Sequence, residues 1–267
     1  MTVELRGAVV VVTGASAGIG RATALALAEA GADVVVAARR KERLEELAAQ
    51  IGQSGRAALP IRCDVTKVKD LTELRDQVQE AFGRADVLVN NAGISGGGGF
   101  ANLDLERIEE TIRTNVLSVM WATKLFLPMM LERGRGHVVN VASLAGRYAV
   151  PGASVYSAAK HGVVAFSESL FYELKDRGVL VTAVNPGFVA TEGFPHTDKD
   201  PWMVMKPERV AATIVDVLRR GRAPEVTIPR WIAPAQAVRV LVPPLYRFGL
   251  SRAARRTSTG ERPRRAE

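Results

Sequence analysis

The strongest constraint on the fold is the alternation along the chain of short, continuously apolar runs with longer stretches of helical periodicity. Runs such as "VVVV" and "VVVAA" lack the period-two pattern of a half-exposed strand, so both faces of each strand must be covered. The expected strands are Ala8–Val12, Val34–Ala38, Ala57–Cys63, Val87–Asn90, His137–Val141, Val179–Val184 and Val226–Ile228. Parallel strands with helices on both faces predict a doubly wound, Rossmann-like α/β fold of about seven strands in a single domain.

Positive charge is concentrated at the C-terminal end. The 267-residue chain has a formal net charge of +8, and Ser251–Glu267 alone holds six Arg and two Glu. This distribution argues against a nucleic-acid-binding domain. Because the tail has almost nothing apolar to bury, we expect residues 251–267 to be disordered and solvated. The alternative is contact with an anionic membrane or another acidic partner.

Composition divides the chain into a domain over residues 1–230, a mostly apolar extension over 231–250 and the basic tail. The extension is not a transmembrane helix, because arginines and prolines interrupt it. Cover for the substrate pocket or a subunit interface is the favoured prediction, and peripheral membrane contact through residues 231–267 is the alternative. The single cysteine, Cys63, and an N-terminal apolar run too short for a signal peptide predict a cytoplasmic protein.

The turn after the first expected strand carries a nucleotide-binding pattern. It reads "TGASAGIG" and holds Gly14, Gly18 and Gly20 immediately before a helix rich in Ala and Leu. In doubly wound sheets ligands lie outside the carboxyl ends of the strands, and a helix N-terminus favours the negative charge of a pyrophosphate. The glycines permit a tight turn and a close approach of the backbone, so we predict a dinucleotide site here.

The end of the second strand favours NADP over NAD. An enzyme that prefers NAD offers a carboxylate to the adenosine ribose, but Asp33 precedes the strand and lies at its wrong end. At the carboxyl end stands Ala38, followed by Arg39, which can grip a 2′-phosphate. We predict Arg39 as the phosphate ligand and Ser16 as a second contact. The alternative is that these arginines only begin the next helix.

Tyr156 and Lys160 are four residues apart and fall on one face of an expected helix. This spacing is common by chance, so the rest of the sequence decides its meaning. The order "TGASAGIG", "CDVT", "NNAG", Asn115, Ser143, "YSAAK" and "NPG" resembles the short-chain dehydrogenase/reductase family, in its subgroup of roughly 250-residue chains. The resemblance runs from about residue 5 to residue 230.

The resemblance implies a catalytic set of Asn115, Ser143, Tyr156 and Lys160. Tyr156 would be the general acid, Ser143 would hold the substrate oxygen, and Lys160 would favour the phenolate and bind the nicotinamide ribose. Asn115 would hold a water that links Lys160 to solvent. A free Tyr has a pKa of about 10, which has to be lowered to near 7. One positive charge lowers a pKa by about one to three units, so Lys160 is barely enough and oxidised nicotinamide would contribute as well.

The resemblance also implies the remaining cofactor contacts. Asp64, at the end of the third strand, would contact adenine, and "NAG" at residues 91–93 would form the wall after the fourth strand. Pro186 and Gly187, followed by Val189 and Thr191, would fix the nicotinamide carboxamide. For Asn90, the first residue of "NNAG", the alternative to a role at the cofactor is a structural one, in which it is buried, hydrogen-bonded to backbone and holds neighbouring strands together. The full implied cofactor set is Gly14, Ser16, Gly18, Ile19, Gly20, Arg39, Asp64, Val65, Asn91, Ala92, Gly93, Tyr156, Lys160, Pro186, Gly187, Val189 and Thr191.

The expected activity is hydride transfer between NADP(H) and an alcohol or carbonyl compound. The segment after "NPG" carries apolar residues that predict a lipophilic substrate, namely Phe188, Phe194, Pro195, Trp202, Met203 and Met205. Apolar helices near Leu105–Leu131 and Val155–Lys175 predict a homodimer or homotetramer. No metal site is expected, because His137, His161 and His196 lack ligand spacing. The competing hypothesis is a non-catalytic NADP-binding redox sensor or scaffold on the same fold.

Overall fold

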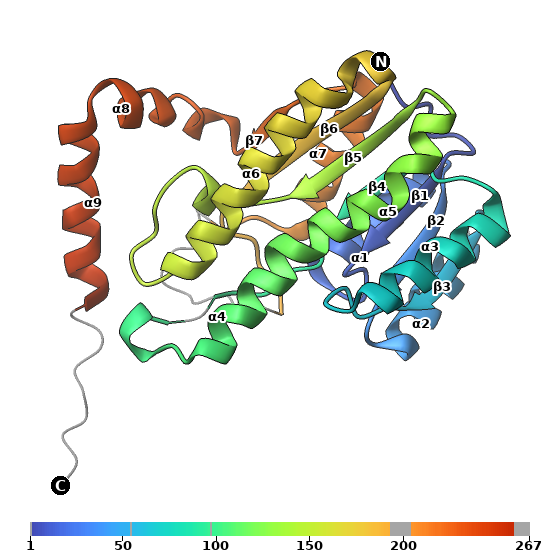
Figure 1. Ribbon diagram of the computed structural model, residues 1–267, viewed down its shortest axis with the longest axis horizontal. Helices are drawn as coiled ribbons and strands as arrows, with labels where there is room; N and C mark the ends of the chain where they lie inside the picture. The colour runs from blue at the N-terminus through green and yellow to red at the C-terminus, as the bar shows by residue number, and fades with distance from the viewer. Residues whose placement is uncertain (1, 54, 97, 193–203, 259–267) are drawn as a thin grey trace, which may run out of the picture.

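The computed structural model describes residues 2–53, 55–96, 98–192 and 204–258. Its seven strands are all parallel and lie in the order β3-β2-β1-β4-β5-β6-β7 (Figure 1). They are β1 Val9–Thr13, β2 Asp33–Ala38, β3 Ala58–Arg62, β4 Val87–Asn90, β5 Gly136–Val141, β6 Val179–Pro186 and β7 Glu225–Ile228. The expected doubly wound fold is confirmed, and no predicted strand end differs by more than two residues.

Helices cover both faces of this sheet (Figure 1). The α-helices are α1 Gly18–Glu29, α2 Lys41–Gly52, α3 Val68–Phe82, α4 Leu105–Ile112, α5 Ser118–Glu132, α6 Ser154–Leu174, α7 Pro207–Arg220, α8 Ala235–Leu241 and α9 Pro243–Ser258. Short 3-10 turns lie at Phe100–Asn102, Leu144–Gly146, Lys175–Arg177 and Arg230–Ile232.

The valines of β1 explain why its sequence shows no alternation. Val10 and Val12 pack into the core beneath α1, α2 and α7, whereas Val9 and Val11 pack into the core beneath α3, α5 and α6. Side chains of a strand alternate between the two faces of its sheet, and here both faces are dry. All four valines are at most 1 % exposed.

The topology places a crevice at the carboxyl ends of β1 and β4. The chain runs outward from β1 through β2 to β3, and then crosses back to place β4 on the other side of β1. The loops after β1 and β4 therefore turn away from each other, which is where doubly wound sheets bind ligands. The predicted glycine turn and the "NNAG" stretch follow these two strands.

The helix expected near Leu105–Leu131 is interrupted. Between α4 and α5, residues Arg113–Leu117 form a π-helical turn, and Asn115 lies in its middle. Within the described residues, Leu105–Glu132 is also the stretch long and apolar enough to cross a membrane. That measure rests on length and composition alone, and Phe126 and Met130 of this stretch are buried in the core beneath the sheet.

The C-terminal extension differs from its prediction in one respect. Residues 251–258, expected to be disordered, continue helix α9, while residues 259–267 lie outside the described part of the chain. Prolines begin α9 at positions that a helix N-terminus tolerates, and small residues and arginines continue it. In Figure 1, α8 and α9 (red) lie beyond β7 and stand apart from the body of the domain.

Candidate active site

The turn between β1 and α1 is pressed against the loop that follows β4. Gly14 has φ +67°, and a Cβ added there would lie 2.8 Å from the Ala92 Cα. A Cβ at Gly20 would clash with the Gly14 carbonyl oxygen and lie 2.5 Å from the Asn91 amide nitrogen. Only glycine satisfies both the positive φ and the close approach. The two glycines therefore let the turn pack directly against the loop after β4.

Asn91 braces this turn from the β4 loop. Its side-chain amide donates hydrogen bonds to the carbonyl oxygens of Thr13, at 3.0 Å, and Gly14, at 3.2 Å. The backbone N–H groups of Asn91 and Ala92 in turn donate to the Thr13 hydroxyl. Helix α1 begins without a side-chain cap or an acidic first turn, so its N-terminal N–H groups have no competing carboxylate.

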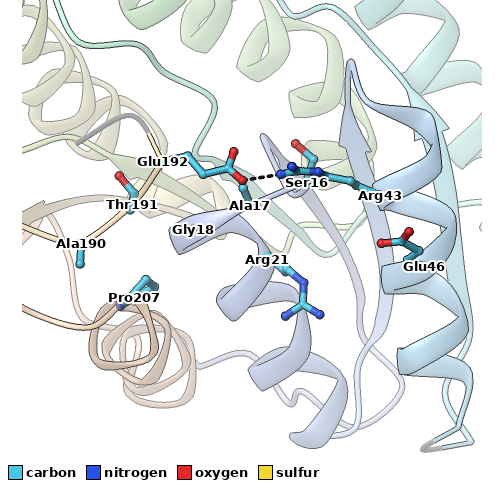
Figure 2. Close-up of a pocket in the computed structure, with 10 residues that line it drawn as sticks. All are labelled: Ser16, Ala17, Gly18, Arg21, Arg43, Glu46, Ala190, Thr191, Glu192 and Pro207. Atoms are coloured by element: carbon cyan, nitrogen blue, oxygen red, sulfur yellow. Dashed lines mark hydrogen bonds and ion pairs between the residues drawn. The ribbon is translucent and has the colours of Figure 1, made fainter. Parts of the chain in front are cut away.

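A cavity of about 610 Å³ opens beside the glycine turn, between α1, α2 and the segment after β6 (Figure 2). Arg40 donates to the Ser16 hydroxyl from Nε at 3.2 Å and from Nη2 at 3.0 Å. Its Nη1 lies 2.8 Å from a Glu192 carboxylate oxygen, and Arg43 pairs with the other oxygen. The lining residues are Ser16, Ala17, Gly18, Arg21, Arg43, Glu46, Ala190, Thr191, Glu192 and Pro207.

The arginine that hydrogen-bonds Ser16 is Arg40, and the role of Arg39 as the phosphate ligand stays a prediction. Arg39 is exposed and contributes to the field at Asp64 instead. Arg40 and Arg43 are three residues apart at the start of α2, so both reach one side of the helix. That spacing is visible in the sequence. The sequence gives no sign that Glu192 pairs with these arginines, because the segment after β6 brings it beside α2 only in the folded protein.

Helix α6 places Tyr156 and Lys160 one turn apart at the carboxyl end of the sheet. The Lys160 ammonium nitrogen lies 5.7 Å from the centre of the Tyr156 ring and donates to the Val141 carbonyl oxygen at 2.9 Å. Ser143 follows β5; its hydroxyl accepts from the Ala145 N–H at 3.1 Å and lies close enough to the Tyr156 phenol to lower the pKa of that phenol. Three of the four residues predicted to be catalytic thus form one connected cluster.

Asn115, the fourth residue, is fully buried in the π-helical turn. Its amide donates to the carbonyl oxygens of Ile94, at 2.9 Å, and Thr111, at 3.0 Å, and its oxygen accepts from the Ile94 N–H at 3.2 Å. A Cβ at Gly93 would lie 2.8 Å from the Asn115 oxygen and 3.7 Å from the Lys160 nitrogen. The bare Gly93 therefore separates these two side chains. Such π-helical turns are frequent at functional sites.

Burial sets the pKa values in this cluster. It lowers the pKa of Lys160 to about 8 and raises the pKa of Tyr156, which the hydrogen bond with Ser143 partly offsets. Burial is the largest cause at Tyr156, so its pKa is raised in the protein without cofactor, and stabilisation of the phenolate by the Lys160 charge stays a prediction. Tyr156 holds its proton at neutral pH.

The other predicted cofactor residues follow the strand ends as expected. Asp64 and the buried Val65 come after β3, and Asp64 accepts from the Thr66 N–H at 3.1 Å and hydroxyl at 2.8 Å. Burial alone would raise the pKa of Asp64, but the Thr66 hydrogen bonds and nearby Arg39 lower it overall. Ile19 packs against the core below α1.

The segment after β6 folds over the glycine turn. Pro186 ends the strand, and the Gly187 N–H donates to the Ile228 carbonyl oxygen at 2.8 Å. Val189 pairs with Met205 in a parallel bridge, and Thr191 contacts Gly18, where an added Cβ would lie 2.9 Å from the threonine methyl. The predicted lid residues Phe194, Pro195, Trp202 and Met203, together with His196, lie outside the described residues.

Asn90 has the alternative, structural role. It is buried and donates to Asn140 on β5 at 2.9 Å and to Thr123 on α5 at 3.1 Å. The Asn140 amide in turn donates a hydrogen bond to the Ser167 hydroxyl on α6 at 2.9 Å. His137 is likewise buried in β5 against Thr182, and burial lowers its pKa to about 3. These groups join strands to helices below the site, and none belongs to the catalytic cluster.

Comparisons with known proteins agree with this geometry. The family model for short chain dehydrogenases matches residues 8–202. Ketoacyl reductase HetN of Nostoc sp. strain PCC 7120 is 42 % identical over 189 residues, which cover 71 % of this chain and just under two thirds, 66 %, of HetN.

Two solved structures have the same fold. A tryptophan variant of actinorhodin polyketide ketoreductase with NADPH superposes with a TM-score of 0.77 at 34 % identity, covering 85 % of this chain and 97 % of the ketoreductase. A short-chain dehydrogenase/reductase from Burkholderia phymatum in complex with NAD gives a TM-score of 0.81 at 26 % identity, covering 91 % and 96 %. The chain therefore belongs to the short-chain dehydrogenase/reductase family, and is an oxidoreductase with a site for a nicotinamide cofactor.

Proposed function

We propose that this protein is an NADP-dependent reductase of lipophilic ketones, or the dehydrogenase of the corresponding alcohols, with Tyr156 as the general acid/base. The observation that carries the proposal is the cluster in which the Ser143 hydroxyl and the Tyr156 phenol lie beside the buried ammonium of Lys160, 5.7 Å from the centre of the Tyr156 ring. A protein that only bound the cofactor would have no chemical need for this cluster.

The cluster divides the proton chemistry of carbonyl reduction among its members. Bound NADPH would supply the hydride to the carbonyl carbon. The Ser143 hydroxyl orients the carbonyl oxygen and stabilises charge that develops on it. Tyr156 donates its proton to that oxygen, and the Lys160 ammonium stabilises the phenolate that remains. Asn115 holds a water from which Tyr156 is reprotonated through Lys160.

The pKa directions favour reduction at neutral pH. Burial raises the pKa of Tyr156, so the phenol is a proton donor in the ground state of the protein. Alcohol oxidation needs the phenolate instead, and its rate therefore rises with pH until the tyrosine is ionised. The positive charge of oxidised nicotinamide lowers that requirement when the reaction runs in this direction.

The choice of NADP rests on the arginine pair at the start of α2. Arg40 and Arg43 present two guanidinium groups to one carboxylate, that of Glu192, beside the Ser16 hydroxyl. A 2′-phosphate offers the same anionic oxygens with more charge, and guanidinium groups bind such oxygens in pairs. Glu192 is then the counterion that the phosphate displaces. Arg39, exposed beside Asp64, is a further candidate contact.

The substrate class follows from the residues around the catalytic cluster. Leu144 follows Ser143 and lies 3.3 Å from a Cβ built at Gly187, which places it against the start of the segment after β6. Phe188 is 47 % exposed, and Met205 is buried against the same stretch. This apolar surface supports a ketoacyl compound or a similar lipophilic ketone as the substrate. So does the similarity to the ketoacyl reductase HetN and to the actinorhodin polyketide ketoreductase.

Assembly and location are part of the same proposal. Helices α5 and α6 are apolar around much of their circumference, and Tyr172 on α6 is 58 % exposed, which supports a homodimer or homotetramer formed through these helices. The lone Cys63 is buried, and burial raises its thiol pKa to about 12, which suits a reduced thiol in the cytoplasm.

The test is a titration of the purified protein with NADPH and NADH, followed by nicotinamide fluorescence. Each complex is then offered a β-ketoacyl thioester, an aromatic ketone and a ketose sugar. We expect tighter binding of NADPH and its oxidation by the lipophilic ketones. Binding without oxidation by any substrate would favour the redox sensor, and a preference for NADH would remove the arginine argument.

A further inference from the structure

We propose that α8, α9 and the 3-10 turn before them form an arm, residues 230–258, that binds the surface of an anionic membrane. Among the side chains of the arm that the structure describes, seven large apolar ones are exposed. Val240 is 74 % exposed and Leu241 77 %, and the other large apolar residues with exposed side chains are Trp231, Val238, Val242, Leu245 and Phe248. Single exposed leucines are ordinary, but a run of this length marks a surface that another phase or molecule covers.

The hydrogen bonds described between the arm and the domain come from three residues of the arm, Ile232, Arg239 and Tyr246. The Tyr246 ring packs against Arg239, so the two helices share a polar, domain-facing side. Through this side the arm contacts the loop after Ser143 and the helix of Tyr156. The hydrogen bonds are Tyr148 to the Ile232 carbonyl at 3.0 Å, the Ala149 N–H to the Tyr246 hydroxyl at 3.2 Å, Arg239 to His161 at 3.0 Å and Arg239 to the Arg147 carbonyl.

Charge identifies the kind of partner. Between Glu225 and Glu261 the sequence holds no acidic residue and six arginines, at positions 230, 239, 247, 252, 255 and 256. Residues 230–267 carry seven of the eight net positive charges of the chain, so the catalytic domain is almost neutral. Exposed apolar side chains interspersed with arginines bind the boundary between acyl chains and anionic headgroups, where tryptophan is also favoured.

Other partners suit this surface less well. A nucleic acid would take the arginines but offers no partner for Val240, Leu241 and Leu245. A second copy could cover the arm with its own domain, but that domain has a net charge close to zero and so offers the arginines no net negative surface. The anionic membrane satisfies both the apolar and the basic side chains of the arm.

The arm is attached next to the catalytic cluster, so membrane binding would affect how a substrate reaches the site. The strands point toward the side of the molecule where α9 lies (Figure 1), and the arm contacts the loop that links Ser143 to Tyr156. A membrane bound by the arm would therefore lie on the same side as the catalytic cluster. A lipophilic substrate could then enter from the bilayer without crossing water. The membrane inference itself depends neither on the cofactor nor on the reaction.

The experiment is co-sedimentation of the full-length protein with vesicles of phosphatidylcholine alone and with added phosphatidylglycerol. We expect the protein to sediment with the anionic vesicles and to be released as salt is raised, because screening weakens the attraction. The emission of Trp231, which is 69 % exposed, should shift to the blue on binding, and Trp231→Phe should remove that change. Protein that stays in the supernatant with anionic vesicles would overturn the proposal.

A matched pair of variants separates the arm from a general charge effect. Leu245→Asp places a carboxylate on the arm, whereas Val68→Asp places one at an exposed apolar position on α3. We expect the first to weaken vesicle binding at least about tenfold and the second to change it less than about twofold. Equal weakening by both variants would contradict the proposal. The oligomeric state, measured by sedimentation without vesicles, gives a second way to contradict it. If the wild type does not bind vesicles and Leu245→Asp dissociates its oligomer, the arm serves a subunit interface and the proposal is wrong.

Discussion

Strand β1 and the arm that ends the chain are both rich in apolar residues, but β1 buries these side chains and the arm exposes them. The valines of β1 are at most 1 % exposed and divide between two cores, whereas Leu241 and Leu245 on the arm are more than half exposed. The domain balances its charges almost completely, and the arm has no acidic residue between positions 226 and 260. The two cores of the domain are thus closed within the chain, whereas the exposed apolar side chains of the arm need cover from outside it.

The two regions also differ in how they treat polar groups. Inside the domain, the buried side chains of Asn90 and Asn140 are paired with one another, and the buried ammonium of Lys160 donates to the Val141 carbonyl oxygen. Keeping a charge there lowers the stability of the fold and creates the proton chemistry of the site. On the arm, Arg247 is exposed to solvent and its charge has no such cost. Removing individual groups from the two regions should therefore have very different effects.

The largest expected effect is on turnover, from Tyr156→Phe. The variant keeps the ring that packs beside Lys160 and loses only the phenolic hydroxyl. We expect ketone reduction to fall by about 10³-fold or more, while NADPH binding measured by fluorescence changes little. Appreciable residual turnover would remove Tyr156 from the acid role.

Lys160→Met should make the cofactor-free protein more stable at neutral pH while it abolishes activity. Burial lowers the lysine pKa from 10.5 to about 8, which corresponds to about 3 kcal/mol against the charged form in the fold. Loss of the hydrogen bond to Val141 offsets about 1 kcal/mol of the gain. We expect a free energy of unfolding roughly 2 kcal/mol higher than wild type at pH 7, measured with urea.

The pH dependence of that difference tests its cause. Between pH 8 and pH 10.5 the unfolded chain binds more protons at Lys160 than the folded chain does, so the stability of the wild type rises with pH in this window. The methionine variant has no such gain. The difference in unfolding free energy should therefore be largest below pH 8 and shrink toward pH 10.5, and a difference that is constant with pH would contradict this origin.

A smaller effect is expected at the arginine pocket. Arg40→Ala combined with Arg43→Ala removes both guanidinium groups that now hold Glu192. We expect the Kd for NADPH to rise roughly 10- to 100-fold and the Kd for NADH to stay within about twofold, because only the 2′-phosphate is affected. Equal losses for both cofactors would mean that the arginines serve the fold and not the phosphate.

Glu192→Gln is the reverse test of the same pocket. The arginines hold the Glu192 pKa low through their hydrogen bonds, so its carboxylate is charged and competes with the phosphate. Neutralising it should lower the Kd for NADPH by about two- to fivefold, with no change for NADH. Glu46→Gln is the matched control, since Glu46 lines the same cavity and forms no ion pair with Arg40 or Arg43.

The sequence predicted the fold, and it predicted that Tyr156 and Lys160 lie close together, because both depend on local patterns. Continuous valine runs define buried parallel strands, and the four-residue spacing of Tyr156 and Lys160 places them on one side of α6. Asn115 was expected inside an ordinary helix, and its π-helical turn depends on the tertiary contact with Ile94. Glu192 could not be predicted, because its partners are 149 and 152 residues distant in the sequence. Helix α9 was missed because its arginines resemble a solvated tail.

The smallest expected effect is on stability, from removal of residues 243–267. If α9 is completed by a partner outside the chain, its deletion takes away little that the domain needs in solution. The specific hydrogen bond lost is the one from the Ala149 N–H to the Tyr246 hydroxyl, worth about 1 kcal/mol. We therefore expect urea unfolding to show a free energy within about 1 kcal/mol of wild type, with unchanged turnover of a water-soluble ketone. A Tyr246→Phe variant should account for most of that small loss. A deficit of several kcal/mol would mean instead that α9 packs against the domain in solution, and the contrast between the two regions would then fail.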